Sequence, residues 1–183
     1  MSIVGLDLSL TCTGLARIHP DGQAYTWHIT STGKRGDTLT DRALRIHRMA
    51  GQILADIGDD DQIVIEAPSH GQPGGSTWDR AGAWWAVVSA LHRRDIPVCM
   101  VSPTTRAKWA TGTGRGDKAA VAVAMSKLFP DVDLANSDEA DALALAHIGA
   151  VLAAGYSVPT LARHTIDSLP PAVAAWATKV GAA

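Results

Sequence analysis

The sequence has little cysteine, no long apolar run and no surplus of basic residues, and each absence narrows the class of protein. Cysteine occurs only as Cys12 and Cys99, without a CxxC pair or a Cys/His ligand spacing, which argues against a zinc site and favours a reducing compartment. No apolar run approaches the roughly 20 residues that cross a bilayer. The opening MSIVGLDL lacks the basic and apolar regions of a signal peptide. We therefore expect a cytoplasmic protein with no membrane partner.

The charge balance is unlike that of most nucleic-acid-binding domains. Sixteen basic and 18 acidic residues give a net charge of −2, whereas such domains usually carry a basic surplus. The charge is unevenly placed, however. Residues 131–141 hold five acids and no base, residues 102–127 hold five bases and one acid, and residues 34–48 hold five bases and two acids. Basic segments beside an acidic cluster can bind a polyanion without making the whole chain basic.

Length and apolar content predict one packed domain of the α/β class. The 183 residues suffice for one domain with a sizeable core and are too few for two, and a hydrophobic content of 46% predicts a packed globular body. Short connections predict that the first three strands form an antiparallel meander, so we expect a five-stranded mixed sheet with one antiparallel strand, flanked by helices. The expected strands are 2–10, 13–19, 24–30, 62–68 and 97–101, and the expected helices are 38–57, 77–94, 103–110, 117–128 and 137–154.

The end of the chain is less regular. Residues 155–171 are linker-like, and a weaker helical pattern follows Pro170 and Pro171. We therefore expect one folded domain at 1–155 and a tail at 156–183 that is helical and packs on the same domain. The spacing of the elements alone does not separate this order from other α/β folds.

Four acidic residues stand in apolar surroundings. Asp7 lies within the first strand and Glu66 lies near the end of the fourth, where an unpaired buried carboxylate is costly and needs a partner or a cation. Asp138 and Asp141 are three residues apart in a predicted helix and therefore share a face. If the first and fourth strands are neighbours, all four carboxylates can converge, and such oxygen ligands suit a pair of magnesium ions.

Each acid also has a purely structural interpretation. Asp7 could cap a turn, Glu66 could pair with an arginine across the sheet, and Asp138 could sit in the first turn of its helix, where the helix dipole favours an acid. The joint pattern favours a site over four separate structural roles.

Four sequence blocks in this order resemble the RuvC family of Holliday junction resolvases, from the first strand to about Gly155. The resemblance implies an RNase H-like fold, with metal-binding carboxylates at Asp7, Glu66, Asp138 and Asp141 for two Mg²⁺ ions that Mn²⁺ can replace. It also implies a glycine-rich loop with Gly112 and Gly114 that ends in a catalytic Lys118. The blocks are VGLDLSLTCTG (4–14), VIEAPSHG (64–71), VSPTTRAKWATGTGRGDKAAV (101–121) and SDEADALALAH (137–147).

The chain departs from the family pattern at the residues expected to contact DNA. Ala107 stands where the family has a second basic residue, and either Arg106 or Lys108 beside it could take that role. Ser69 and His70 replace an aromatic wedge that stacks on a base, and Trp78 could stack in its place.

The glycine-rich loop offers further phosphate contacts. Arg115 and the backbone amides of Gly112 and Gly114 could grip a phosphate next to the one that is cut. Arg115 taken alone could equally be a solvated loop residue.

Two adjacent tryptophans, Trp84 and Trp85, fall on the predicted helix 77–94, which the family uses for dimerisation. They are expected in the core or at the interface of a homodimer. By contrast, His47, His92 and His147 are expected to be partly exposed helix residues rather than ligands.

The resemblance implies a homodimeric Mg²⁺-dependent endonuclease that nicks four-way DNA junctions symmetrically and leaves 5′-phosphate and 3′-hydroxyl ends. A relaxed nuclease for flaps and forks with the same site is the alternative. The motif D-x-S-x-x-x-x-G at Asp7 also resembles the phosphate loop of actin-like ATPases, but 183 residues cannot supply the two lobes that those proteins need. The cleavage sequence, any motor partner and a bacterial or phage origin stay open.

Overall fold

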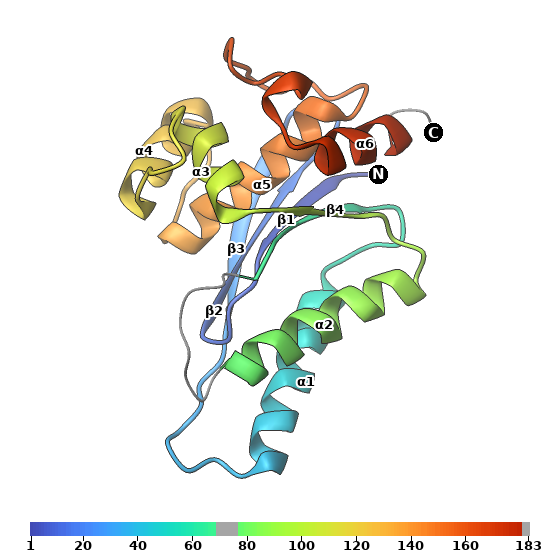
Figure 1. Ribbon diagram of the computed structural model, residues 1–183, viewed down its shortest axis with the longest axis vertical. Coiled ribbons are helices and arrows are strands. Elements are labelled where there is room, and N and C mark those ends of the chain that lie inside the picture. The colour runs from blue at the N-terminus through green and yellow to red at the C-terminus, as the bar shows by residue number, and fades with distance from the viewer. Residues whose placement is uncertain (69–76, 181–183) are drawn as a thin grey trace.

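A computed structural model describes residues 1–68 and 77–180 of the chain. Its centre is a five-stranded sheet in the order β3-β2-β1-β4-β5 (Figure 1). β1, β4 and β5 are parallel, while β2 is antiparallel to both β1 and β3. This confirms the predicted mixed sheet with one antiparallel strand and the predicted meander. The strands are β1 (Ile3–Asp7), β2 (Cys12–Ile18), β3 (Ala24–Thr30), β4 (Gln62–Glu66) and β5 (Val98–Val101).

Helices cover both faces of the sheet. α1 and α2 pack on one face, and α3, α4, α5 and α6 lie on the other (Figure 1). Each face has its own hydrophobic core. Buried strand residues alternate between them, with Val4 in the core under α1 and α2 and Ile3 in the core under α3 to α6, as the two-residue repeat of a strand requires. The helices are α1 (Leu39–Ala55), α2 (Thr77–Arg93), α3 (Pro103–Thr111), α4 (Lys118–Leu128), α5 (Ser137–Leu152) and α6 (Pro171–Val180), with a short 3₁₀ turn at Ile166–Ser168.

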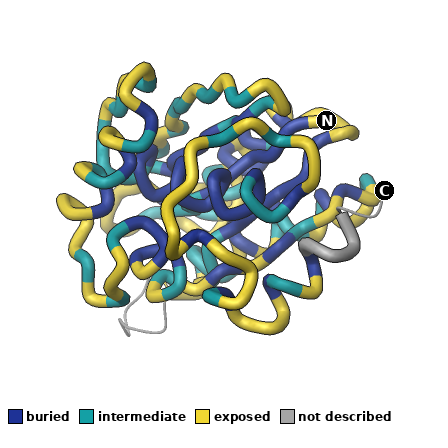
Figure 2. The backbone as a smooth tube through the Cα atoms, turned by 90° about the horizontal axis from the view of Figure 1, so that it is seen from above, coloured by how far each residue is buried: buried dark blue, intermediate teal, exposed yellow. Residues whose placement is uncertain are grey.

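Helix α5 is the buried centre of its layer. Every residue from Glu139 to Ala150 is buried, and the buried segments occupy the middle of the molecule in Figure 2. α5 lies directly on β1, because a Cβ added to Gly5 would be 2.0 Å from the carbonyl oxygen of Ala142. The helix that carries Asp138 and Asp141 is thereby held against the strand that carries Asp7.

Two strands end earlier than the sequence predicts. β1 stops at Asp7 instead of continuing to residue 10, and β4 stops at Glu66 instead of residue 68. After Asp7 the chain turns, and the hydroxyl of Thr13 closes the turn by donating to the carbonyl of Ser9 at 2.8 Å. Asp7 is therefore at the carboxyl end of its strand and not in the middle of it. Since β1 and β4 are parallel neighbours, their two acids lie at the same edge of the sheet.

The segment after α5 packs on the rest of the chain. α6 contacts α5 and β5, and Val173 and Trp176 belong to the core on that face. Among the described residues, no helix combines the length and the apolarity needed to cross a membrane.

Candidate active site

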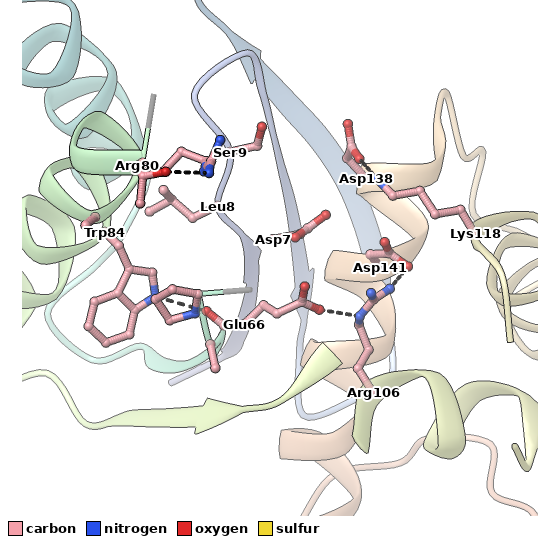
Figure 3. Close-up of a pocket in the computed structure, with 14 residues that line it drawn as sticks. Asp7, Leu8, Ser9, Glu66, Arg80, Trp84, Arg106, Lys118, Asp138 and Asp141 are labelled. Atoms are coloured by element: carbon pink, nitrogen blue, oxygen red, sulfur yellow. Dashed lines mark hydrogen bonds and ion pairs between the residues drawn. The ribbon is translucent and has the colours of Figure 1, made fainter. Parts of the chain in front are cut away.

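A cavity of about 770 Å³ opens at the carboxyl ends of β1 and β4 (Figure 3). Three elements that are far apart in the sequence supply its acids. Asp7 comes from β1, Glu66 comes from β4, and Asp138 and Asp141 come from the first turns of α5. The structure thus brings together the four acids that the sequence singled out.

The two strand acids are poorly solvated. Burial raises the pKa of Asp7 above its usual value, and the neighbouring cations Arg106 and Lys118 only partly counteract this. Burial also raises the pKa of Glu66 to about 7, and the nearby Asp7 carboxylate adds to the rise. A further cation close to these poorly solvated carboxylates would stabilise their charged forms.

Arg106 stands between two of the acids. β5 leads into α3 through Ser102, whose hydroxyl caps the helix, and Pro103 at the first helical position. This start turns Arg106 inward, where its guanidinium pairs with the carboxylates of Glu66 and Asp141 (Figure 3). Of the two bases beside Ala107, the structure therefore puts Arg106 in the cavity.

Lys118 reaches the same cavity from the first residue of α4. Its Nζ donates to Oδ1 of Asp138 at 2.6 Å, and its side chain is largely exposed. The side chain of Asp117 caps α4 by accepting from the amide of Ala120 at 2.7 Å. The end of the glycine-rich loop thus points its ammonium group at the acidic cluster.

A buried acid that the sequence analysis did not single out anchors α5. Glu139 accepts hydrogen bonds from the hydroxyl of Thr26 at 2.7 Å and from the amide of Ala135 at 3.1 Å. Its other oxygen lies 2.7 Å from Nδ1 of His28. These contacts join the start of α5 to β3 and hold Asp138 in place. The sequence held a sign of it, since Glu139 is an acid next to Asp138 in a helix that is mostly apolar.

The tryptophan pair separates into one core residue and one surface residue. Trp84 is 9% exposed, belongs to the core under α2 and lines the cavity, and its Nε1 donates to the carbonyl of Glu66 at 2.9 Å. Of the two expected places, core or interface, Trp84 therefore takes the core, and its burial argues against its assignment to the interface. Trp85 is 61% exposed. Adjacent helix positions point about 100° apart, so only one of the two can face the core.

Other expected DNA contacts lie outside the cavity. Lys108 and Gly112 line a separate small hollow on the far side of α3. Arg115 is exposed in the loop before Lys118, with Gly114 partly buried beside it. Trp78 is 82% exposed in the first turn of α2. Ser69 and His70 lie outside the described residues.

Helix α2 forms one wall of the cavity, which was not predicted from the sequence. Thr77, Arg80, Ala81 and Trp84 of α2 all line it. Their spacing of three and four residues places them on one face of the helix, so the pattern was present in the sequence. Arg80 adds a second arginine to the lining, on the side opposite Arg106 (Figure 3).

The residues of the cavity suit divalent cations. Four carboxylates and three bases, Arg80, Arg106 and Lys118, line it, and within the described part of the chain Oδ2 of Asp141 is buried without a hydrogen-bond partner. Carboxylate oxygens are the ligands that Mg²⁺ and Mn²⁺ prefer. Within 1–68 and 77–180, no three carboxylate, imidazole or thiol groups already converge on one point. Arg106 fills part of the space between the acids and offsets part of the charge that metal ions would offset.

Comparisons with known proteins agree with this arrangement. No protein-family model matches the chain. It is 32% identical over 146 residues to the crossover junction endodeoxyribonuclease RuvC of Erythrobacter litoralis, which covers 79% of this chain and 89% of the relative. It is also 32% identical over 149 residues to the RuvC of Sphingopyxis alaskensis, covering 80% and 94%.

Solved structures give the same fold. The structure of Thermus thermophilus RuvC superposes with a TM-score of 0.63 at 20% identity and covers 80% of this chain and 91% of that one. The same protein in complex with a Holliday junction substrate gives a TM-score of 0.62 at 19% identity, covering 80% and 90%. These matches confirm the predicted RNase H-like fold.

Proposed function

Since the chain belongs to the RuvC family of crossover junction endodeoxyribonucleases, we propose that it resolves four-way DNA junctions by paired nicks that leave 5′-phosphate and 3′-hydroxyl ends. The observation that carries this proposal is the meeting of four carboxylates and three bases in one open cavity. The relatives bear the name crossover junction endodeoxyribonuclease, and the Thermus thermophilus protein was solved with a Holliday junction substrate. Action on DNA in the cytoplasm is part of the proposal.

Asp7, Glu66, Asp138 and Asp141 would hold two Mg²⁺ ions. Bound there, the ions would supply activation of the attacking water and charge that offsets the leaving oxygen. The acids also keep the cavity negative, so a DNA phosphate can enter only once cations have offset their charge. The chain's own part is to bring the four acids to the wall of one cavity, on β1, β4 and α5.

Lys118 and Arg106 would act on the phosphate. The ammonium of Lys118 is exposed at the rim of the cavity, where it can pair with a phosphate oxygen and offset charge that develops there during cleavage. Arg106 is planar and can bind a phosphate through two parallel hydrogen bonds. Both would exchange a carboxylate partner for the phosphate.

The surface outside the cavity offers groups for the rest of the DNA. Arg115 and the amides of Gly112 and Gly114 would contact phosphates on the side of α3 and α4, and Lys108 would extend this contact. Trp78, exposed at the start of α2, is suited to stack on an unpaired base. Together with residues such as Ser69 and His70, these groups would set how strictly the protein selects four-way junctions.

The cleavage assay tests the proposed function. With Mg²⁺, the purified protein should cut a synthetic four-way junction at symmetric positions at least about ten times faster than a linear duplex. The reason is that only the branched substrate presents two phosphates to the two sites of a symmetric dimer. Equal rates on a Y-fork or flap would support the relaxed branched-DNA nuclease instead.

The metal provides the control for that assay. Mn²⁺ should replace Mg²⁺, whereas Ca²⁺ should support junction binding without cleavage, because its longer and looser coordination positions the reacting oxygens poorly. Binding is read by gel shift and cleavage by denaturing gel. Full cleavage in EDTA would rule out the metal-dependent mechanism, and turnover of ATP without cleavage would point to the actin-like alternative.

Trp85 is proposed as the centre of the homodimer interface. It shares an exposed stripe of α2 with Trp78 and Gly82, which lie seven and three residues before it. Changing Trp85 to Glu should yield a folded monomer by sedimentation that nicks slowly and without paired cuts. Trp84→Glu is not a matched test, because it would bury a charge in the core. A dimeric Trp85→Glu protein with normal resolution would place the interface elsewhere.

A further inference from the structure

The segment between α5 and α6 caps the last turn of α3. Nε of Arg163 donates to the carbonyl of Trp109 at 3.0 Å, and its Nη2 donates to the carbonyl of Ala110 at 2.5 Å. Nε2 of His164 lies 3.1 Å from the carbonyl of Trp109. The last carbonyls of a helix lack partners within the helix, and a cation is favoured at that end. Arg163 meets both needs.

A buried aromatic cluster fixes the segment in place. The ring of His164 stacks on Trp109 with centroids 4.5 Å apart and planes at 16°. Nε1 of Trp109 donates to Nδ1 of His147 at 3.1 Å, which leaves Nε2 of His147 to donate to the carbonyl of Pro159 at 2.8 Å. His147 is fully buried, in contrast to the partial exposure expected from the sequence. The stretch predicted to be linker-like is thus attached to α3 and α5.

The last turn of α3 in turn sets the path of the glycine-rich loop. α3 ends at Gly112, whose φ of 84° favours glycine. The amide of Thr113 then donates to the hydroxyl of Thr111 at 3.2 Å. A Cβ on Gly114 would lie 2.8 Å from the side chain of Thr104, so the loop is folded back on α3. A shift of this turn would therefore be passed on to Lys118, which follows the loop.

We propose that Arg163 is a positioning residue for Lys118, acting through the capped end of α3. The proposal rests on the proposed nuclease function, in which Lys118 acts at the phosphate. Arg163 itself does not line the cavity; it lies beside Gly112 in the hollow behind α3. Its removal takes the donor from the carbonyl of Ala110 and leaves the carbonyl of Trp109 with His164 alone, which lets the loop move, while the four acids stay on β1, β4 and α5.

A double-mutant cycle tests whether Arg163 acts on cleavage through Lys118. Arg163→Ala should slow single-turnover cleavage of a four-way junction in Mg²⁺ by about 10- to 100-fold, the effect of a misplaced group of this kind. Junction affinity should change less than about two-fold, since most affinity comes from phosphate contacts elsewhere. In a Lys118→Ala background, Arg163→Ala should add less than about two-fold. Leu161→Ala is the matched control, because Leu161 is exposed in the same segment and its side chain does not cap α3; it should cut normally.

Two results would overturn the proposal. One is an unchanged rate for Arg163→Ala, and the other is an equal slowing with and without Lys118, which a general loss of structure would give. Arg163→Gln, which keeps one donor for a carbonyl, replaces the alanine variant if that variant does not fold.

A measurement without DNA separates this proposal from the proposed function. Hydrogen exchange of the metal-free protein should be faster at amides 111–116 in Arg163→Ala than in Leu161→Ala and the wild type, by about five-fold or more. Equal exchange in all three proteins would overturn the capping role. If the wild type does not cut junctions but the exchange difference is present, the proposed nuclease function is wrong, whereas the capping role of Arg163 is supported.

Discussion

Changing Glu66 to Gln should slow junction cleavage by about 10³-fold or more, corresponding to the several kcal/mol that a metal site contributes to such a reaction. The amide keeps the size of the side chain and removes its charge. Glu66 is placed to hold a cation because it ends β4 and lines the cavity with Asp7, and a cation there would stabilise its poorly solvated carboxylate. Junction affinity should stay within a few-fold, because the basic segments supply most of it. Asp7→Asn should behave in the same way.

The rate is measured under single-turnover conditions and the affinity by gel shift in Ca²⁺. Asp59→Asn provides a matched control, since the same chemical change occurs there on a carboxylate whose side chain is 82% exposed and pairs only with Arg94 in the described structure. That variant should cut at the wild-type rate. A Glu66→Gln protein that cuts at a near wild-type rate would contradict the assignment of the four carboxylates.

The four acids could be predicted from the sequence because the unfavourable free energy of a buried carboxylate can be recognised from its apolar neighbours in the sequence. A carboxylate after Ile63, Val64 and Ile65 needs a compensating partner wherever the strand lies, and the three-residue spacing of Asp138 and Asp141 holds in any helix. Parallel pairing of β1 with β4 then suffices to bring the strand acids together. The order of strands and helices followed from the same apolar periodicities, and the structure confirms it.

The partners of these acids depend on which side of each helix faces the cavity, and this is harder to predict from the sequence. Arg106 and Lys108 are both near Ala107, but only the start of α3 at Pro103 decides that Arg106 points to the acids. The tryptophan pair was ambiguous for the same reason. Trp84 faces the core because α2 packs on α1 and β4, and no local pattern distinguishes it from Trp85.

The burial of His147 depends on contacts distant in sequence. The residues that cover it, Pro159 and His164, belong to a segment with no apolar period. A histidine on a helix gives no sign that such a segment will fold over it. The cap on α3 was therefore inaccessible to sequence analysis, although each of its contacts is ordinary once the chain path is known.

Gly14→Ala should lower both stability and cleavage through a single contact. Gly14 lies in β2 opposite Asp7, and a Cβ there would stand 2.0 Å from the carbonyl oxygen of Asp138 and 2.8 Å from the amide nitrogen of Glu139. Both are backbone atoms, so no side-chain rotation relieves the clash, and the first turn of α5 has to move away from β2. We expect a loss of about 1–3 kcal/mol in the free energy of unfolding, as for other overpacked sites.

The same displacement separates Asp138 and Asp141 from the acids on β1 and β4. Cleavage by the folded variant should fall by about 10²-fold, the cost of a misplacement near 1 Å. Urea unfolding and single-turnover cleavage well below the unfolding midpoint measure the two effects. Gly51→Ala is the control, because a Cβ at this position of α1 meets nothing within 4 Å. It should stabilise the protein by about 0.5–1 kcal/mol and leave cleavage unchanged. If Gly14→Ala cuts like the wild type, the close contact between β2 and α5 does not set the geometry of the acids.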